Sequence, residues 1–333
     1  MAVHGEAIAE HERGPLLTIS ELRVDLQSGA RTVHAVRGLS YDIHPGEMLG
    51  MVGESGSGKS MSALAIMGLL PPGGQRSVSG SISFRGRDLL GLNPAAMRRL
   101  RGREIAMVFQ DPLSSLNPVR TVGSQIAEVL RRQLSMRNTA ARRRAIELMQ
   151  LVGIPDAASR YRSYPHQFSG GMRQRVMIAI AIACEPKLLI ADEPTTALDV
   201  SVQAQIIELF ERLRRELQMA VLLISHDLGL IGQIADRVLI VYAGRVVESG
   251  TPDVIFTQSN HPYTRGLLAS IPRIDGPRRN ELPQINGAPP DLAAEIRGCP
   301  FAPRCPLVEG RCVEDPPTTW RAPGHSAACW ATS

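Results

Sequence analysis

Long apolar runs are missing from this sequence of 333 residues, and aromatic side chains make up only 4% of it. The longest uninterrupted apolar run, residues 176–184, is far shorter than the roughly 20 residues that a transmembrane helix needs. The N-terminal stretch MAVHGEAIAEHERGP also lacks the apolar core of a secretory signal. We therefore expect a cytoplasmic protein, and any role at a membrane must then come through a partner.

Charge of either sign is not in large excess, because 37 basic residues stand against 32 acidic ones and the net charge is +5. A small positive excess fits a protein that works beside anionic phosphates or a membrane surface. The most basic stretch, residues 131–144, lacks the interleaved aromatic residues that single-stranded nucleic-acid sites use for stacking. We interpret this stretch as a solvated helix face and expect no nucleic-acid partner.

Buried strands are predicted from short apolar runs that show no polar alternation. These runs are residues 48–52, 105–109, 188–191, 221–224 and 238–241. Residues 59–70 and 202–217 have helical patterns and lie between such runs, so βα units are the expected outcome. The sequence predicts an α/β fold around a mostly parallel sheet.

Two further changes of pattern divide the chain. Residues 118–167 are predicted to form a helical subdomain inserted in the α/β core, with Asn138 and Thr139 as candidate N-caps and Gly153 as a helix end. After residue 250 the composition shifts, since 13 of the 24 prolines fall in the last 83 residues and proline interrupts helices and sheets. The expected parts are a short tail (1–16), an α/β domain (17–250) and a loop-rich extension (251–333).

A phosphate-binding loop is the clearest chemical motif. Its residues fit the pattern GxxxxGK(S/T) and are Gly53, Glu54, Ser55, Gly56, Ser57, Gly58, Lys59 and Ser60. The loop follows a predicted strand and precedes a predicted helix, so its backbone N–H groups can surround the β-phosphate of ATP. We expect Lys59 to neutralise the β- and γ-phosphate oxygens and Ser60 to ligate Mg²⁺.

Two carboxylates, Asp192 and Glu193, end another predicted strand about 130 residues after this loop. Packing of an apolar strand does not require acidic residues at that position. Asp192 is predicted to hold Mg²⁺, directly or through water, and Glu193 to polarise the water that attacks the γ-phosphate.

The segment FSGGMRQR, residues 168–175, closely resembles the signature motif of ABC ATPases, and it precedes the carboxylate pair as it does in that family. Ser169 is expected to cap a helix whose N-terminus, together with Gly170 and Gly171, can approach a phosphate. The resemblance implies that this motif closes on ATP held by a second ATPase subunit, so that two subunits form two composite sites.

Three more residues match that family in order. By resemblance, Gln110 contacts Mg²⁺ and the attacking water and reports to a transmembrane partner, Asp199 communicates across the dimer, and His226 contacts the γ-phosphate. Met172 stands where the general signature has Gln, as in the peptide-importer branch.

Residues 27–39 contain no Phe, Tyr or Trp that could stack on the adenine ring of ATP. His34 either stacks on the adenine or has only a role at the protein surface.

Four of the five cysteines, Cys299, Cys305, Cys312 and Cys329, crowd the last 35 residues. In a cytoplasmic chain such crowding favours a metal or cluster site over disulfides. The absence of a CxxC pair speaks against structural zinc, whereas four thiolates suit a 4Fe-4S cluster. The segments GCPFAPRCP and HPYTRGLL resemble the C-terminal extension of oligopeptide and dipeptide transporter ATPases, some of which carry such a cluster. We expect a 4Fe-4S cluster here, with zinc, disulfides or free thiols as alternatives.

Together the resemblances imply an ABC-type nucleotide-binding domain with a β-rich edge that hydrolyses ATP to power an importer of dipeptides or oligopeptides. The implied location is the cytoplasmic face of the membrane. The implied partners are two transmembrane permease subunits, a second ABC ATPase subunit that is a paralogue, and an extracytoplasmic solute-binding protein. The alternatives are an importer of nickel or another small nutrient, a soluble ABC ATPase that acts on nucleic acid, and a module with a dead ATPase. The presence of Lys59, Glu193 and His226 disfavours the last.

Overall fold

The computed structural model of the chain describes residues 14–71, 76–196, 198–271 and 284–331. The chain divides into two compact units. The first unit contains His44–Glu47 and Gly91–Ile224, and the second contains Pro15–Ile43, Met48–Leu90 and Ser225–Ser333. Among the described residues, no helix has the length and apolarity that crossing a bilayer requires.

Three parallel strands form the centre of the first unit: β6 (Ile105–Val108), β7 (Leu188–Asp192) and β8 (Ala220–Ser225). Every residue of the three strands is buried, as expected for strands that are covered on both faces. Leu188 of β7 pairs with Ile105 on one side and with Ala220 on the other. The carboxyl ends of the strands therefore lie at one end of the sheet, which is where parallel α/β sheets place their functional residues.

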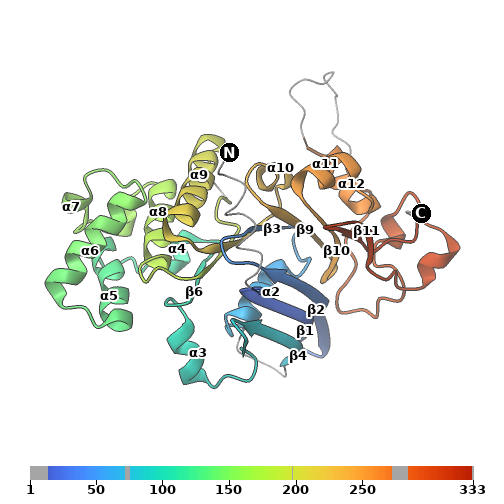
Figure 1. Cartoon of the computed structure of the whole chain (residues 1–333), viewed down its shortest axis with the longest axis horizontal. Coiled ribbons are helices and arrows are strands. Elements are labelled where there is room, and N and C mark those ends of the chain that lie inside the picture. Colours follow the sequence, from blue (N-terminus) through green and yellow to red (C-terminus); the bar gives the residue numbers. More distant parts are fainter. Residues whose placement is uncertain (1–13, 72–75, 197, 272–283, 332–333) are drawn as a thin grey trace, which may run out of the picture. The chain divides into compact units, whose positions relative to one another are not determined.

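Helices make up most of the rest of the first unit (Figure 1). They are α3 (Pro94–Leu100), α4 (Pro112–Ser115), α5 (Val122–Leu134), α6 (Asn138–Leu151), α7 (Ala157–Arg160), α8 (Gly170–Ala181) and α9 (Val200–Leu217), with the 3-10 helix η1 (Pro165–Gln167). Helices α5, α6 and α8 pack against one another. The buried face of α5 carries Ile126 and Leu130, whereas Arg132 lies on its exposed face, so the helix is amphipathic as a helix at the surface of a core must be.

The expected helical segment is present, but its predicted caps are wrong. Helix α6 begins at Asn138, and the N-cap residue Arg137 makes no side-chain capping bond. The side-chain oxygen of Asn138 instead accepts a hydrogen bond from Arg131 Nη1 at 3.2 Å. The predicted end is correct, because Gly153 adopts the left-handed conformation (φ 77°) directly after the last turn.

The second unit contains two groups of strands. The antiparallel group has the order β2-β1-β4-β5 and consists of β1 (Leu17–Ser28), β2 (Arg31–Ile43), β4 (Arg76–Phe84) and β5 (Arg87–Asp88). The other group has the order β3-β9-β10-β12-β11 and consists of β3 (Met48–Val52), β9 (Arg237–Tyr242), β10 (Arg245–Gly250), β12 (His325–Ala327) and β11 (Thr319–Ala322). Only the β3–β9 pair in this group is parallel.

Short helices complete the second unit. They are α2 (Lys59–Ile66), α10 (Leu228–Ile231), α11 (Pro252–Gln258) and α12 (Pro262–Ala269), with the 3-10 helices η2 (Ala302–Arg304) and η3 (Gly310–Val313). Glu248 in β10 lies opposite Ala327 in β12. Segments before and after residue 250 therefore share one sheet, and the extension is tied to the strands near the phosphate-binding loop.

The predicted α/β class is confirmed by these elements, and each of the five apolar runs coincides with a strand to within one residue at either end. Two helix ends differ from the prediction. Helix α2 ends at Ile66 rather than near residue 70, because Gly68 adopts a left-handed conformation (φ 59°) that an α-helix cannot contain. Helix α9 begins at Val200, two residues before the predicted start.

Candidate functional site

The phosphate-binding loop lies between β3 and α2, the local context that its sequence pattern requires. At two positions of the loop, neighbouring backbone leaves no room for a side chain, so glycine is needed there. A Cβ atom added at Gly53 would lie 2.2 Å from the carbonyl oxygen of Val241, and one added at Gly58 would lie 2.4 Å from that of Ala35. Gly58 also has a positive φ of 99°, which favours glycine. The loop is thus held tightly between β2 and β9.

Lys59, the first residue of α2, is almost fully buried with 4% of its surface exposed. Its ammonium nitrogen donates to the carbonyl oxygens of Gly53 and Glu54 at 2.7 and 2.9 Å, and to the hydroxyl of Ser57 at 3.3 Å. The loop therefore curls around a buried positive charge at a helix N-terminus, a combination suited to binding phosphate.

Two contacts to this loop come from the C-terminal extension, and sequence analysis missed both. The guanidinium of Arg304 forms a two-pronged ion pair with the Glu54 carboxylate, with N–O distances of 2.8 and 3.0 Å. The hydroxyl of Tyr263 accepts a hydrogen bond from the backbone N–H of Glu54 at 2.9 Å. The HPY segment around Tyr263 carries only a family resemblance, and no sequence pattern indicates that it contacts the loop.

Two other residues that are predicted to contact ATP, His226 and His34, lie in the second unit. His226 is exposed in the turn between β8 and α10, where the next residue, Asp227, caps α10 by accepting from Leu230 N at 3.0 Å. His34 lies in β2, and its Nδ1 atom is 2.8 Å from the Asp25 carboxylate. This contact ties the His34 ring to its neighbouring strand; its proposed stacking on adenine stays a prediction.

The carboxylate pair ends β7 in the first unit. Asp192 is the last residue of that strand and is 6% exposed. Glu193 follows in a left-handed backbone conformation (φ 44°) and donates its N–H to the carbonyl of Ile224 at 2.9 Å. One oxygen of the Glu193 side chain, Oε2, accepts from the amide of Gln110 at 3.1 Å and from the hydroxyl of Thr196 at 2.9 Å. The structure therefore brings Gln110 and Glu193 together, 83 positions apart in sequence.

The signature segment begins α8 as predicted. Ser169 is the N-cap, and its hydroxyl accepts from Met172 N at 3.4 Å. A Cβ atom at Gly171 would lie 2.6 Å from Val202 Cγ1, so this glycine allows α8 to approach α9 closely. Asp199 is exposed at the N-cap position of α9 and makes no side-chain capping bond. Ser169 and Gly170 are also exposed, which leaves this helix start open to a partner.

The expected 4Fe-4S cluster at Cys299, Cys305, Cys312 and Cys329 is wrong, and so is its zinc alternative. All four are free cysteines, and the part of the chain that the structure describes contains no group of three or more His, Cys, Asp or Glu side chains able to hold a metal ion. Burial raises the pKa of the Cys299 thiol to about 11 and also raises the pKa values of Cys305 and Cys329. Metal ligation requires thiolates, which these surroundings disfavour.

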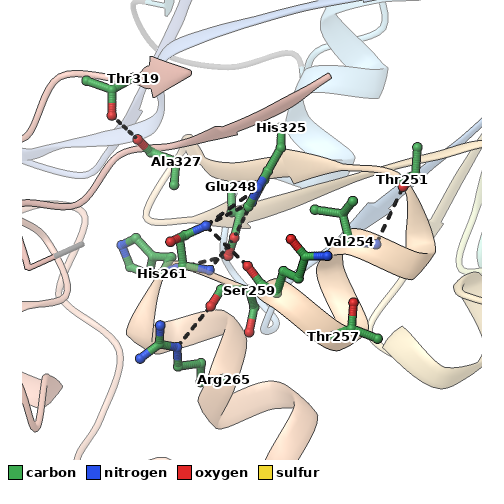
Figure 2. Close-up of polar contacts among 12 residues, drawn as sticks. Glu248, Thr251, Val254, Thr257, Ser259, His261, Arg265, Thr319, His325 and Ala327 are labelled. Atoms are coloured by element: carbon green, nitrogen blue, oxygen red, sulfur yellow. Dashed lines mark hydrogen bonds and ion pairs between the residues drawn. The ribbon is translucent and has the colours of Figure 1, made fainter. Parts of the chain in front are cut away.

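A buried polar network fixes the start of α12 (Figure 2). The side chain of Glu248 in β10 accepts from the backbone N–H groups of Asn260 and His261 at 2.6 and 3.1 Å, and it lies 2.9 Å from His325 Nε2. His261 Nδ1 in turn accepts from Tyr263 N at 3.1 Å and caps the helix. Burial lowers the pKa of His261 to about 4, so this ring is a neutral acceptor at physiological pH.

Two family profiles match the chain. The ABC transporter family matches residues 36–196, and the C-terminal region of oligopeptide/dipeptide transporters matches residues 247–312. The dipeptide transport ATP-binding protein DppD of Bacillus subtilis (strain 168) is 50% identical over 95% of this chain and 94% of its own length. The oligopeptide transport ATP-binding protein OppD of Mycobacterium tuberculosis is 52% identical over 96% of this chain, which spans about half (52%) of that relative.

Solved structures of ATP-binding cassettes are also similar to this chain. The ATP-binding cassette MJ0796, in a dimeric post-hydrolysis state bound to ADP and Pi, has a TM-score of 0.63 and 26% identity over 71% of this chain and 98% of that chain. The structure of cbiO1 from Clostridium perfringens, part of the transporter complex cbiONQ, has a TM-score of 0.62 and 27% identity over 74% of this chain and 92% of its own.

Proposed function

We propose that Glu193 is the general base of this chain, which belongs to the ABC transporter family, in the branch of ATP-binding subunits for oligopeptides and dipeptides. The chain is an ATPase that powers peptide import. The observation that carries this proposal is the arrangement at the end of β7, where Gln110 and Thr196 both donate to Glu193 Oε2. Two donors on one oxygen fix the plane of the carboxylate, which is what positioning a water for in-line attack requires.

In this proposal the Glu193 carboxylate accepts the proton of the attacking water while the oxygen of that water bonds to the γ-phosphorus. The bond from the γ-phosphorus to the bridging oxygen breaks, and ADP leaves with that oxygen. His226 contacts the γ-phosphate and helps to hold the group that is transferred. The Gln110 side chain orients the carboxylate and the water, and it reports nucleotide state to the transmembrane partner.

The phosphates of ATP are bound by the loop from Gly53 to Ser60. Its backbone N–H groups surround the β-phosphate, and Lys59 turns its ammonium group from the loop carbonyls toward the β- and γ-phosphate oxygens. Bound Mg²⁺ would neutralise charge on these oxygens. The hydroxyl of Ser60, the carboxylate of Asp192 and the amide oxygen of Gln110 are the oxygen donors that Mg²⁺ prefers, so the residues present fit this ion.

A second ATPase subunit, a paralogue of this chain, completes each site. Ser169, Gly170 and Gly171 would then contact the ATP held by that subunit, and Asp199 would communicate across the dimer. The exposure of Ser169, Gly170 and Asp199 supports this role. The dimeric state of the MJ0796 cassette supports it by analogy.

The remaining partners follow from the branch of the family. We propose a nucleotide-binding domain at residues 17–250, with its helical subdomain at 118–167, and an extension at 251–333. The chain would bind two transmembrane permease subunits at the cytoplasmic face of the membrane, and an extracytoplasmic solute-binding protein would deliver the peptide. The match of residues 247–312 to oligopeptide/dipeptide transporters supports peptides over nickel as the cargo.

Peptide uptake by the reconstituted complex tests this proposal. The chain, its partner ATPase and the permease pair would be placed in proteoliposomes with the binding protein outside and ATP enclosed. We expect uptake of a labelled dipeptide or tripeptide that is abolished by Lys59→Ala and kept by Arg297→Ala, a substitution of an exposed arginine in the extension. Uptake of nickel but not of peptides, or normal peptide uptake with Lys59→Ala, would contradict the proposal.

A further inference from the structure

The side chain and the backbone N–H of Glu54, the second residue of the phosphate-binding loop, are both held by groups that lie more than 200 positions later in the chain. Tyr263 fixes its backbone and Arg304 its side chain. Tyr263 is completely buried, and the Arg304 side chain is only 6% exposed. These are therefore packed contacts rather than surface ion pairs, which contribute little.

The guanidinium of Arg304 uses all of its donors at this place. Besides the two bonds to Glu54, Nη1 donates to the hydroxyl of Tyr242 at 3.2 Å, Nη2 to the carbonyl of Ile285 at 3.3 Å and Nε to that of Asn286 at 3.0 Å. Five N–H groups with five acceptors give the side chain one orientation. Lysine has no such fork and could not reproduce the arrangement.

The Tyr263 side chain is also held in one position. The backbone N–H of Tyr263 donates to His261 Nδ1. The backbone N–H of His261 in turn donates to Glu248, as Figure 2 shows. Its ring packs against Tyr242 and Phe301, with ring centroids 4.6 and 5.5 Å away. The hydroxyl therefore has a set position from which to accept the Glu54 N–H.

The charge of Glu54 gives these contacts a consequence for ATP. A carboxylate in a loop that binds the polyphosphate of ATP repels it, and the repulsion is strong where little water screens it. Arg304 neutralises that carboxylate in place. Removal of Arg304 would leave the negative charge of Glu54 partly buried beside the phosphates, the situation that makes breaking one half of a buried ion pair so unfavourable.

We propose that Arg304 and Tyr263 of the C-terminal extension are positioning residues of the ATP site, which set the affinity for ATP by holding Glu54 and cancelling its charge. The inference rests on the assignment of Gly53 to Ser60 as the phosphate-binding loop. It gives the extension a role in nucleotide binding within its own chain, in addition to any part in assembly.

A cycle of variants tests the inference on the full chain purified with its partner subunits. The measurements are the Kd of a fluorescent Mg²⁺·ATP analogue, and KM and kcat for ATP. We expect Arg304→Ala to raise Kd and KM by ~10-fold or more, with kcat within about 3-fold of the parent. The double variant Glu54→Gln/Arg304→Ala should regain most of the affinity, because the uncompensated charge is gone. Arg297→Ala is the matched control and should bind ATP as the parent does.

Two milder variants keep the test decisive if Arg304→Ala does not fold. Arg304→Lys keeps the charge but loses the fork, and Tyr263→Phe removes one hydroxyl. Each should weaken ATP binding by ~3- to 10-fold and lower the melting temperature by no more than about 10 °C, so that the chain stays folded at the assay temperature. Parent-like Kd values for both variants would overturn the inference. So would an Arg304→Ala defect that the double variant does not relieve.

The Lys59→Ala variant separates this inference from the assignment on which it rests. Loss of ATP binding in Lys59→Ala, together with parent-like binding in Arg304→Lys and Tyr263→Phe, would reject the role of the extension alone. Normal ATP binding in Lys59→Ala would instead reject the phosphate-binding loop itself.

Discussion

The side-chain amide of Gln110 and the carboxylate of Glu193 lie 3.1 Å apart at the ends of two neighbouring parallel strands, β6 and β7. Glu193 adopts a left-handed backbone conformation there, which costs a residue with a side chain about 1–2 kcal/mol. Such strain persists only where the surroundings impose it, and it is common in active sites. The backbone bond to Ile224 and the two side-chain bonds to Oε2 supply that constraint.

We expect Thr196 to contribute to ATP hydrolysis only through its hydroxyl, which donates to Glu193. Thr196→Val keeps the shape of the side chain but removes the donor to Glu193, and we expect kcat for ATP to fall by ~5- to 10-fold, the equivalent of one lost orienting hydrogen bond. Thr196→Ser keeps the donor and should retain most of the activity. Steady-state ATPase assays of the assembled complex would decide, and equal activity of the two variants would show that the hydroxyl has no part in orienting the base.

Ser169 combines a structural and a functional role that a matched control can separate. Ser169→Ala removes the cap of α8 and should lower the free energy of unfolding by about 1 kcal/mol. Thr251→Ala removes a similar cap, that of α11, whose hydroxyl accepts from Val254 N at 3.5 Å. We expect a similar loss of stability from both, but a clear loss of ATPase activity of the assembled complex only from Ser169→Ala. Equal activities would argue against contact of the signature with ATP.

His261 is expected to make the stability of the chain depend on pH. In the unfolded chain its imidazole takes up a proton as the pH falls below about 6.5, whereas in the folded chain burial lowers its pKa to about 4. The unfolded state binds more protons between these values, so the free energy of unfolding should fall as the pH is lowered through this window, by at most about 3 kcal/mol.

The variant His261→Asn checks this contribution. Asparagine can still accept the Tyr263 N–H as an N-cap but does not titrate. Denaturant unfolding at a series of pH values between 4 and 7 should give a smaller slope of stability against pH for the variant than for the parent. The same slope for both proteins would mean that His261 does not contribute.

The motifs could be predicted from sequence because each depends on short-range spacing. The strand at Met48–Val52 and the helix that follows it place Lys59 without any distant information. The Ser169 cap follows from its position directly before two glycines. These local patterns correctly predict the α/β class and the start of α8.

The contacts that needed tertiary structure could not be predicted. Glu54 and Arg304 are 250 positions apart, and nothing in the spacing of either residue indicates its partner. The predicted cap at Asn138 is wrong because its side chain bonds Arg131 on the preceding helix instead of capping its own helix. The predicted cluster at the cysteines is wrong because crowding in sequence does not ensure that thiols converge in space, and the described residues contain no group able to hold a metal ion.

The Glu193→Gln variant tests the central claim most directly. Hydrolysis of ATP by the assembled complex would be measured together with equilibrium binding of Mg²⁺·ATP to the same preparation. We predict binding at least as tight as that of the parent and a turnover lower by ~100-fold or more, because the amide can orient the water but cannot accept its proton. Turnover within a few-fold of the parent, at normal ATP binding, would contradict the assignment of Glu193 as the general base.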